Sequence, residues 1–256
     1  MSIHNCQLVP LDDMLQNGTV IARTKIDTPN SFRTACNIAT QISAAVGSNQ
    51  YGGQTISLTH LAPFVEKSRQ KNKQEIKEAM DFAGIPYTEE QLNKFTEKRL
   101  RKEIADGVQT IQYQYLTLST TNGQSPFITI WMYLDETDDL KLRADLALII
   151  EEMLKQRIKG IKNEFGAWIS PAFPKLVYCI SRSNCDESTP YWYLTELAAK
   201  CTAKRMVPDY VSEKIMLQYK IDKNGNGNVY PPMGLDIYSP CKIWLTLLKG
   251  CEFITC

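Results

Sequence analysis

The sequence has few histidines and no long apolar run. His4 and His60 are its only imidazoles, and they lie far apart in the chain. A hydrolase built on a Ser-His-Asp or Cys-His arrangement therefore has little to draw on. No apolar run reaches about 18 residues, the length a membrane helix needs, and residues 1–5 lack a basic and apolar leader. We expect no membrane segment and a cytoplasmic location.

The chain also lacks an excess of charge of either sign. Its 29 Lys and Arg residues nearly balance 28 Asp and Glu residues. The net charge therefore gives no overall electrostatic attraction to nucleic acid. Neither glycine-rich phosphate motif is present. The run from Asp222 to Gly227 imitates the start of a calcium loop. Met233 stands where that loop requires a bidentate Glu, so we interpret the run as a polar turn.

None of the eight cysteines forms a C-x-x-C pair. A zinc site needs clustered soft ligands, so we predict no metal site and expect most of the thiols to be small buried hydrophobes. Five are spread singly along the chain, at positions 6, 36, 179, 185 and 201. The other three, Cys241, Cys251 and Cys256, crowd the last 16 residues.

Helical and strand patterns alternate along the chain. Apolar spacing predicts helices over 31–48, 58–82, 88–116, 140–161 and 191–204, with Thr88 and Gln91 resembling a capping box. We interpret the charged stretch 67–77 as a solvated face. Extended segments are predicted at 6–9, 19–26, 127–134, 168–180 and 206–211, and a loop at 48–55. This alternation is typical of an α/β fold with a mainly parallel sheet.

Five ordered blocks resemble the catalytic subunit of anaerobic, glycyl-radical (class III) ribonucleoside-triphosphate reductases. They are HNCQLVPLDDMLQNG (4–18), ATQI (39–42), SNQYGGQTISLTHLAPFV (48–65), PAFPKL (171–176) and YWYLTELAAKCTAKRMVPDY (191–210). The resemblance runs from residue 4 to residue 234. Another glycyl-radical enzyme, such as a formate-lyase relative, would fit a half-barrel but not the blocks at 48–65 and 191–210.

The resemblance implies a fold and a chemistry. The family folds as a ten-stranded α/β barrel of two five-stranded halves, so we expect this chain to form the first half, incomplete. Cys6 matches the cysteine on the first barrel strand that works beside the substrate ribose, Asn5 a polar group near that ribose, and Met233 the methionine before the radical cysteine. Formate is the family's reductant. The resemblance implies that an activase, which uses S-adenosylmethionine and an iron-sulfur cluster, installs a glycyl radical in the reductase. It also implies that the full-length reductase holds a structural zinc. We expect none of these cofactors in this chain.

The resemblance also implies partners. Helix 31–48 resembles the family's dimer-face helix, where deoxynucleotide effectors bind, and Gln41 is our candidate effector contact; a polar residue on a packed helix is the alternative. Ribonucleoside triphosphates, a second copy of the subunit and the activase are the further expected partners, without nucleic acid or membrane.

The resemblance stops after Gly234. Leu235 stands where the family has its radical cysteine. We therefore divide the chain into a partial reductase barrel (1–234) and an unrelated tail (235–256), for which a shifted reading frame is our hypothesis. The family's amino-terminal ATP-binding domain and second half-barrel are not found in these 256 residues. We expect a chain that is an oxidoreductase by family but inactive alone, with an open sheet edge that favours association. The alternative is a non-catalytic remnant that dimerises or binds effectors.

Overall fold

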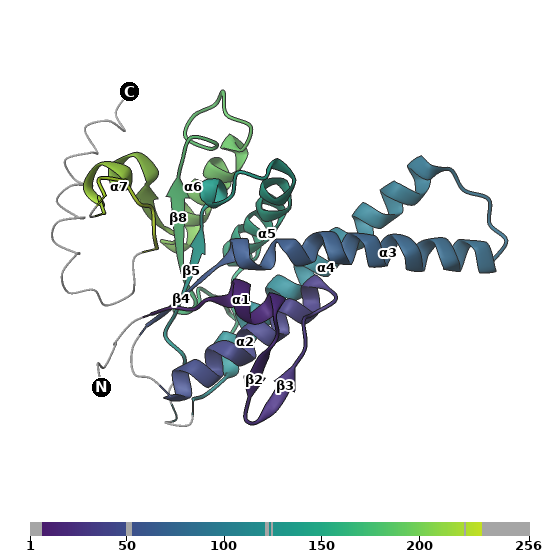
Figure 1. The fold of residues 1–256 in the computed structure, drawn as a ribbon, viewed down its shortest axis with the longest axis horizontal. Helices are drawn as coiled ribbons and strands as arrows, with labels where there is room; N and C mark the ends of the chain where they lie inside the picture. Colours follow the sequence, from purple (N-terminus) through teal and green to yellow (C-terminus); the bar gives the residue numbers. More distant parts are fainter. Residues whose placement is uncertain (1–6, 50–52, 121–122, 124, 223, 232–256) are drawn as a thin grey trace.

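A five-stranded, all-parallel sheet forms the centre of the molecule (Figure 1). The computed structural model describes residues 7–49, 53–120, 123, 125–222 and 224–231. The strand order is β1-β4-β5-β8-β9, so each strand joins the sheet beside the one before it. These strands are β1 (Gln7–Leu8), β4 (Gln54–Ser57), β5 (Ile128–Met132), β8 (Lys175–Ile180) and β9 (Asp209–Ser212). The expected α/β fold with the first five strands of a barrel is confirmed in this arrangement.

Helices connect the strands and cover one face of the sheet. They are α1 (Leu11–Gln16), α2 (Phe32–Asn49), α3 (Pro63–Phe82), α4 (Glu89–Thr117), α5 (Leu140–Lys159) and α6 (Trp192–Arg205), with 3-10 turns η1 (Leu58–Leu61) and η2 (Leu134–Glu136). A last helix, α7 (Glu213–Tyr219), follows β9. Apolar side chains from α1 to α6 form one continuous core with Ile56, Ile130 and Tyr178 of the sheet. This burial of apolar area is the main stabilising contribution to the fold.

The opposite face of the sheet carries a second, smaller apolar cluster. Trp131, Tyr133, Val177 and Cys179 form it, and Val211 and Val229 pack against it. Successive residues of a strand point to opposite faces, so Ile130 enters the helical core while Trp131 enters this cluster. All five residues of β5 are buried, which confirms the predicted strand covered on both sides.

Helices α3 and α4 form a long antiparallel hairpin whose distal end projects from the rest of the molecule (Figure 1). Pro63 occupies the first turn of α3, where a missing N–H does no harm. Thr88 and Gln91 form the predicted capping box at the start of α4. The charged stretch of α3 is not one solvated face: Lys71 and Lys77 are exposed, but Asn72 is buried.

Four segments differ from the expectation. The predicted loop 48–55 contains the start of β4, a buried central strand. Residues 19–26 form a hairpin of β2 (Thr19–Ile21) and β3 (Thr24–Ile26). In 168–180 only β8 joins the sheet, because β7 (Trp168–Ile169) pairs instead with β6 (Ile161–Lys162). Helix α7 was not predicted. Within the described ranges, no helix combines the length and apolar character needed to cross a bilayer.

Candidate functional site

The carboxyl ends of the parallel strands gather polar side chains from four connections. Ligands of open parallel sheets usually bind at this end, where loops follow the strands. Glu136, after β5, accepts hydrogen bonds from Ser57 and from Thr59, the latter at 2.6 Å. This carboxylate therefore ties the end of β4 to the end of β5.

Asp135 is the centre of this edge, and its side chain is fully buried. It accepts hydrogen bonds from the backbone N–H (3.1 Å) and hydroxyl (2.5 Å) of Ser183 after β8. It also forms ion pairs with Arg143 (3.2 Å) and Arg182 (3.5 Å). Burial alone would raise the pKa of Asp135, but hydrogen bonds from Ser181 and Ser183 and the charge of Arg143 lower it below its ordinary value. Asp135 is therefore an anion at neutral pH.

Tyr133 and Cys179 lie side by side in the smaller apolar cluster. The Tyr133 hydroxyl donates to Glu213 at 2.5 Å, and burial together with this carboxylate raises the pKa of the phenol. Burial, then the charges of Glu213 and Asp135, raises the pKa of the Cys179 thiol. Both groups therefore keep their protons at neutral pH. The structure gives Cys179 no role as a thiolate.

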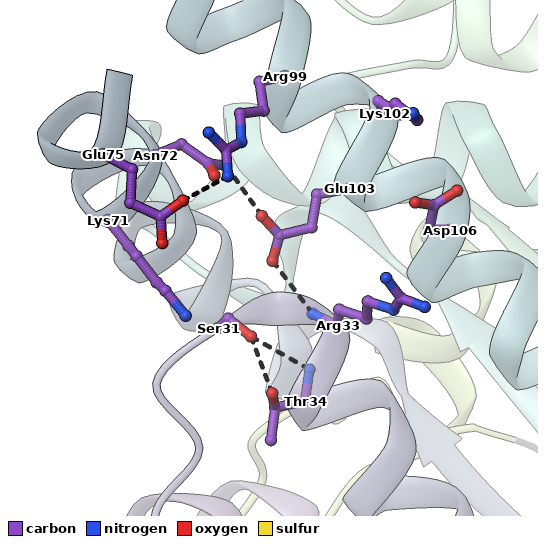
Figure 2. A pocket seen from close by; sticks show the side chains of 10 residues that line it. All are labelled: Ser31, Arg33, Thr34, Lys71, Asn72, Glu75, Arg99, Lys102, Glu103 and Asp106. Carbon is purple, nitrogen blue, oxygen red and sulfur yellow. Dashed lines mark hydrogen bonds and ion pairs between the residues drawn. The ribbon is translucent and has the colours of Figure 1, made fainter. Parts of the chain in front are cut away.

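A concave site lies elsewhere, at the root of the α3–α4 hairpin (Figure 2). It has a volume of about 470 Å³, within the range of small-ligand pockets. Its walls come from the start of α2 and from facing stretches of α3 and α4. The lining residues are Ser31, Arg33, Thr34, Lys71, Asn72, Glu75, Arg99, Lys102, Glu103 and Asp106.

Glu103 organises one wall of this pocket. It accepts hydrogen bonds from the Ser68 hydroxyl (2.6 Å), the Asn72 amide (2.9 Å) and the backbone N–H of Arg33 (3.5 Å). On the neighbouring wall, Arg99 of α4 forms an ion pair with Glu75 of α3 (Figure 2). These contacts fix the relative positions of the three helices around the cavity.

Of the site residues predicted from the sequence, only Gln41 lies among the residues that the structure describes. Gln41 lies on α2 with an exposed side chain. Cys6, Asn5 and Met233, and the position of Leu235, lie outside the described residues. The roles assigned to them by resemblance stay predictions. The pocket at the hairpin root was not predicted, although the charged stretch 67–77 supplies one of its walls.

The described part of the chain offers no group of three or more His, Cys, Asp or Glu side chains that could hold a metal ion. Of its four cysteines, Cys36, Cys179 and Cys201 are buried and Cys185 is exposed. The expectation of mostly buried thiols is confirmed for these four.

Comparison with known proteins identifies the family. The profile of the anaerobic ribonucleoside-triphosphate reductase family matches residues 1–235. The protein of that name from Escherichia coli is 35% identical over 234 residues, which are 90% of this chain and 30% of the relative. The Haemophilus influenzae protein is 33% identical over 233 residues, again 90% of this chain and 30% of the relative.

Solved structures agree with the sequence matches at the level of the fold. The Thermotoga maritima anaerobic ribonucleotide reductase in complex with dATP and CTP superimposes with a TM-score of 0.53 at 14% identity, over 82% of this chain and 34% of that one. The chain thus spans about a third of the length of the proteins it resembles. The chain belongs to the anaerobic ribonucleoside-triphosphate reductase family.

Proposed function

We propose that this chain carries the first half-barrel of a reductase that converts ribonucleoside triphosphates to deoxyribonucleoside triphosphates by thiyl-radical chemistry, with formate as reductant. The observation that carries the proposal is the 33–35% identity to named reductases over 90% of the chain. The five parallel strands in sequential order support it, since they form one continuous half of a barrel wall.

Cys6 and Asn5, directly before β1 in the sequence, are the proposed contacts to the substrate ribose. Loss of the 2′-hydroxyl as water requires a proton donor, and a neutral thiol such as Cys6 can donate that proton. Because its S–H bond carries one hydrogen, the sulfur must take up a proton again before it can donate a hydrogen atom. The thioether of Met233 is proposed to share radical character with a neighbouring sulfur. A glycyl radical, its activase and a structural zinc complete the chemistry in the family. The described residues include no group of three or more His, Cys, Asp or Glu side chains that could hold a metal ion, so the zinc is not assigned to them.

We propose that the chain alone does not turn over, because Leu235 replaces the expected radical cysteine and an aliphatic side chain cannot form a thiyl radical. The test is an anaerobic assay of the purified chain with ribonucleoside triphosphates, formate, S-adenosylmethionine and a radical-forming activase of the family. No deoxyribonucleotide is expected. Product that disappears in Cys6→Ser would overturn the proposed inactivity while supporting the role of Cys6.

A second proposed function is binding of deoxynucleotide effectors by a homodimer through the outer face of α2. The exposed position of Gln41 favours it, since this side chain is free to contact a ligand or a second copy. A ligand that binds the folded state raises its stability, by about 2.7 kcal/mol at a hundredfold excess over Kd. We expect deoxynucleoside triphosphates to raise the melting temperature, and Gln41→Ala to reduce this rise more than Gln109→Ala on the exposed face of α4. Equal rises in both variants would remove Gln41 from the site.

A further inference from the structure

Tyr133 directly follows β5, and its ring lies in the smaller apolar cluster on the sheet face opposite the helical core. Only 7% of the residue is exposed. Its hydroxyl donates a hydrogen bond of 2.5 Å to one carboxylate oxygen of Glu213, at the start of α7. The other oxygen of Glu213 accepts a hydrogen bond of 3.0 Å from the backbone N–H of Arg182. The phenol and its acceptor are therefore held as a fixed pair.

This pair differs from the hydrogen bonds of the other buried tyrosines. The Tyr115 hydroxyl pairs with the Ser43 hydroxyl at 2.9 Å, and the Tyr178 hydroxyl pairs with the Thr195 hydroxyl at 3.0 Å. Hydroxyl groups are neutral and very weak bases. Among the buried tyrosines that the structure describes, Tyr133 alone donates to a carboxylate.

A carboxylate beside a phenol matters when the phenol loses an electron. A phenol that has lost one electron is a strong acid, so its oxidation is easiest when a base within hydrogen-bond reach takes the proton. Simple loss of the proton is a different reaction, and it is disfavoured here, because burial and the hydrogen bond to Glu213 raise the pKa of Tyr133. The pair therefore stays a phenol and a carboxylate until an electron is removed.

Two neighbours of Tyr133 are less well placed to give up an electron. The Trp131 ring lies 5.8 Å from the Tyr133 ring, measured between centroids. Its Nε1 is buried and finds no hydrogen-bond partner among the described residues, so an oxidised indole has no base for its proton. Cys179 lies in the same cluster, and burial, then the charges of Glu213 and Asp135, raises the pKa of its thiol. The thiolate, the form of cysteine that is oxidised most easily, is therefore not populated.

We propose that Tyr133 is a redox-active residue, which a thiyl radical oxidises to a neutral phenoxyl radical while Glu213 takes the proton. The electron leaves the phenol and reduces the thiyl sulfur to a thiolate. The O–H bond of Tyr133 breaks, and a new O–H bond forms on the carboxyl group of Glu213. Because phenol O–H and thiol S–H bonds are of similar strength, the exchange is nearly balanced. Tyr133 thereby takes up a radical that would otherwise abstract hydrogen from the chain.

The position of Tyr133 in the sheet is consistent with this use. Helices cover one face of the sheet, and the smaller apolar cluster lies on the other. When such a sheet closes into a barrel, the face opposite the helices becomes the interior. A radical formed inside the barrel therefore meets the face that carries Tyr133. The physiological oxidant rests on the proposed thiyl-radical chemistry, whereas the redox activity of Tyr133 does not.

The test uses the full chain without oxygen, with photogenerated ruthenium(III) tris-bipyridine as the one-electron oxidant. Samples are frozen at increasing delays, and the tyrosyl signal is measured by electron paramagnetic resonance. Radicals on Tyr113 and Tyr219, which are 45% and 68% exposed, decay by coupling between molecules, whereas a radical on Tyr133 is shielded and persists. We expect a persistent signal that Tyr133→Phe removes. Tyr178→Phe is the matched control, since Tyr178 is fully buried but has no carboxylate partner, and it should keep the signal.

Glu213→Gln separates proton acceptance from the hydrogen bond itself. A glutamine oxygen still accepts a hydrogen bond from the phenol but is a far weaker base, so the persistent signal should fall severalfold. Asp138→Asn, at a carboxylate 96% exposed, is the control and should leave the signal unchanged. Urea melts verify that each variant folds. A parallel run with thiyl radicals from photolysed cystamine, a small disulfide, should give the same persistent signal.

A persistent signal of equal size in the wild type and Tyr133→Phe would overturn the assignment, as would its absence from the wild type. Equal signals in the wild type and Glu213→Gln would remove Glu213 as the proton acceptor and overturn the proposed step. A signal with the ruthenium oxidant but none with cystamine would overturn the thiyl radical as oxidant. Neither oxidant involves a nucleotide, formate or an activase, so these outcomes are independent of whether the proposed reductase function holds.

Discussion

The guanidinium of Arg69 on α3 donates hydrogen bonds to both carboxylate oxygens of Asp145 on α5. The Asp145 side chain is only 5% exposed, and Arg69 also pairs with Glu66 and Glu97. This bidentate pair attaches the root of the projecting hairpin to the helical layer that covers the sheet. The hydrogen bonds that Arg69 donates to Asp145 outweigh the effect of burial and raise the pKa of Arg69 above its ordinary value, so the cation is permanent.

Asp145→Asn should lower the free energy of unfolding by about 3 kcal/mol, because it leaves a partly buried guanidinium without its main counter-charge. Urea denaturation measures the change. Lys73→Gln is the control, since the Lys73–Glu89 pair (3.2 Å) is exposed on both sides and such pairs contribute about 0.5 kcal/mol or less. Similar losses in the two variants would show that the Arg69–Asp145 pair does not hold the hairpin.

Asp135→Asn should also destabilise the fold by about 3 kcal/mol at neutral pH, because it removes the anion between Arg143 and Ser183. The folded-state pKa of Asp135 is lowered from 3.8, so its contribution is full above that pH and is lost as pH falls through the lowered value. Urea melts from pH 7 down to acid should therefore show the wild type and the variant converging. Asp138→Asn, at a side chain 96% exposed, should stay within about 0.5 kcal/mol of wild type. A constant gap at all pH values would mean that the charge of Asp135 is not what matters.

The sequence predicts the regular elements best where apolar spacing is strong. The buried run of β5 and the capping box of α4 were both predicted from local pattern. The strand β4 was not, because Gln54, Thr55 and Ser57 are polar although they are buried. The side-chain NH2 of Gln54 donates to the carbonyl of Ser43 on α2, a contact that no local pattern reveals.

The hairpin at 19–26 shows a second reason why prediction from the sequence is incomplete. Its turn residues Ala22 and Arg23 adopt φ values of 48° and 66°. This region normally favours Gly, Asn or Asp, so the sequence carries no turn signal there. The pocket at the hairpin root was not predicted for a third reason. Arg33, Lys71 and Lys102 come from separate helices, and their convergence depends on tertiary packing alone.

Thr88→Ala should cost about 1 kcal/mol, because the Thr88 hydroxyl accepts a hydrogen bond from the Gln91 N–H at the start of α4. The effect should be local to the distal end of the hairpin. Native-state hydrogen exchange should show faster exchange of amides in the first turn of α4. Thr117→Ala removes an exposed hydroxyl at the other end of the helix, where it donates to the Tyr113 carbonyl, and should leave that exchange unchanged.

Gly107→Ala tests the contact between α2 and α4. A Cβ at Gly107 would lie 2.7 Å from the Phe32 ring and 3.1 Å from the Cys36 sulfur, both fully buried on α2. Replacing Gly by Ala inside a helix normally stabilises it by about 1 kcal/mol. Overpacking a core costs about 1–3 kcal/mol. Because the Phe32 ring is fully buried in the core, we expect overpacking to win, with a net loss of about 1 kcal/mol in urea denaturation.

The control for this substitution is Gln109→Ala, two residues further along α4 and exposed, which should change stability by less than about 0.5 kcal/mol. A Gly107→Ala chain more stable than wild type would show that α2 and α4 can separate slightly without cost and that the glycine is not required for their close packing.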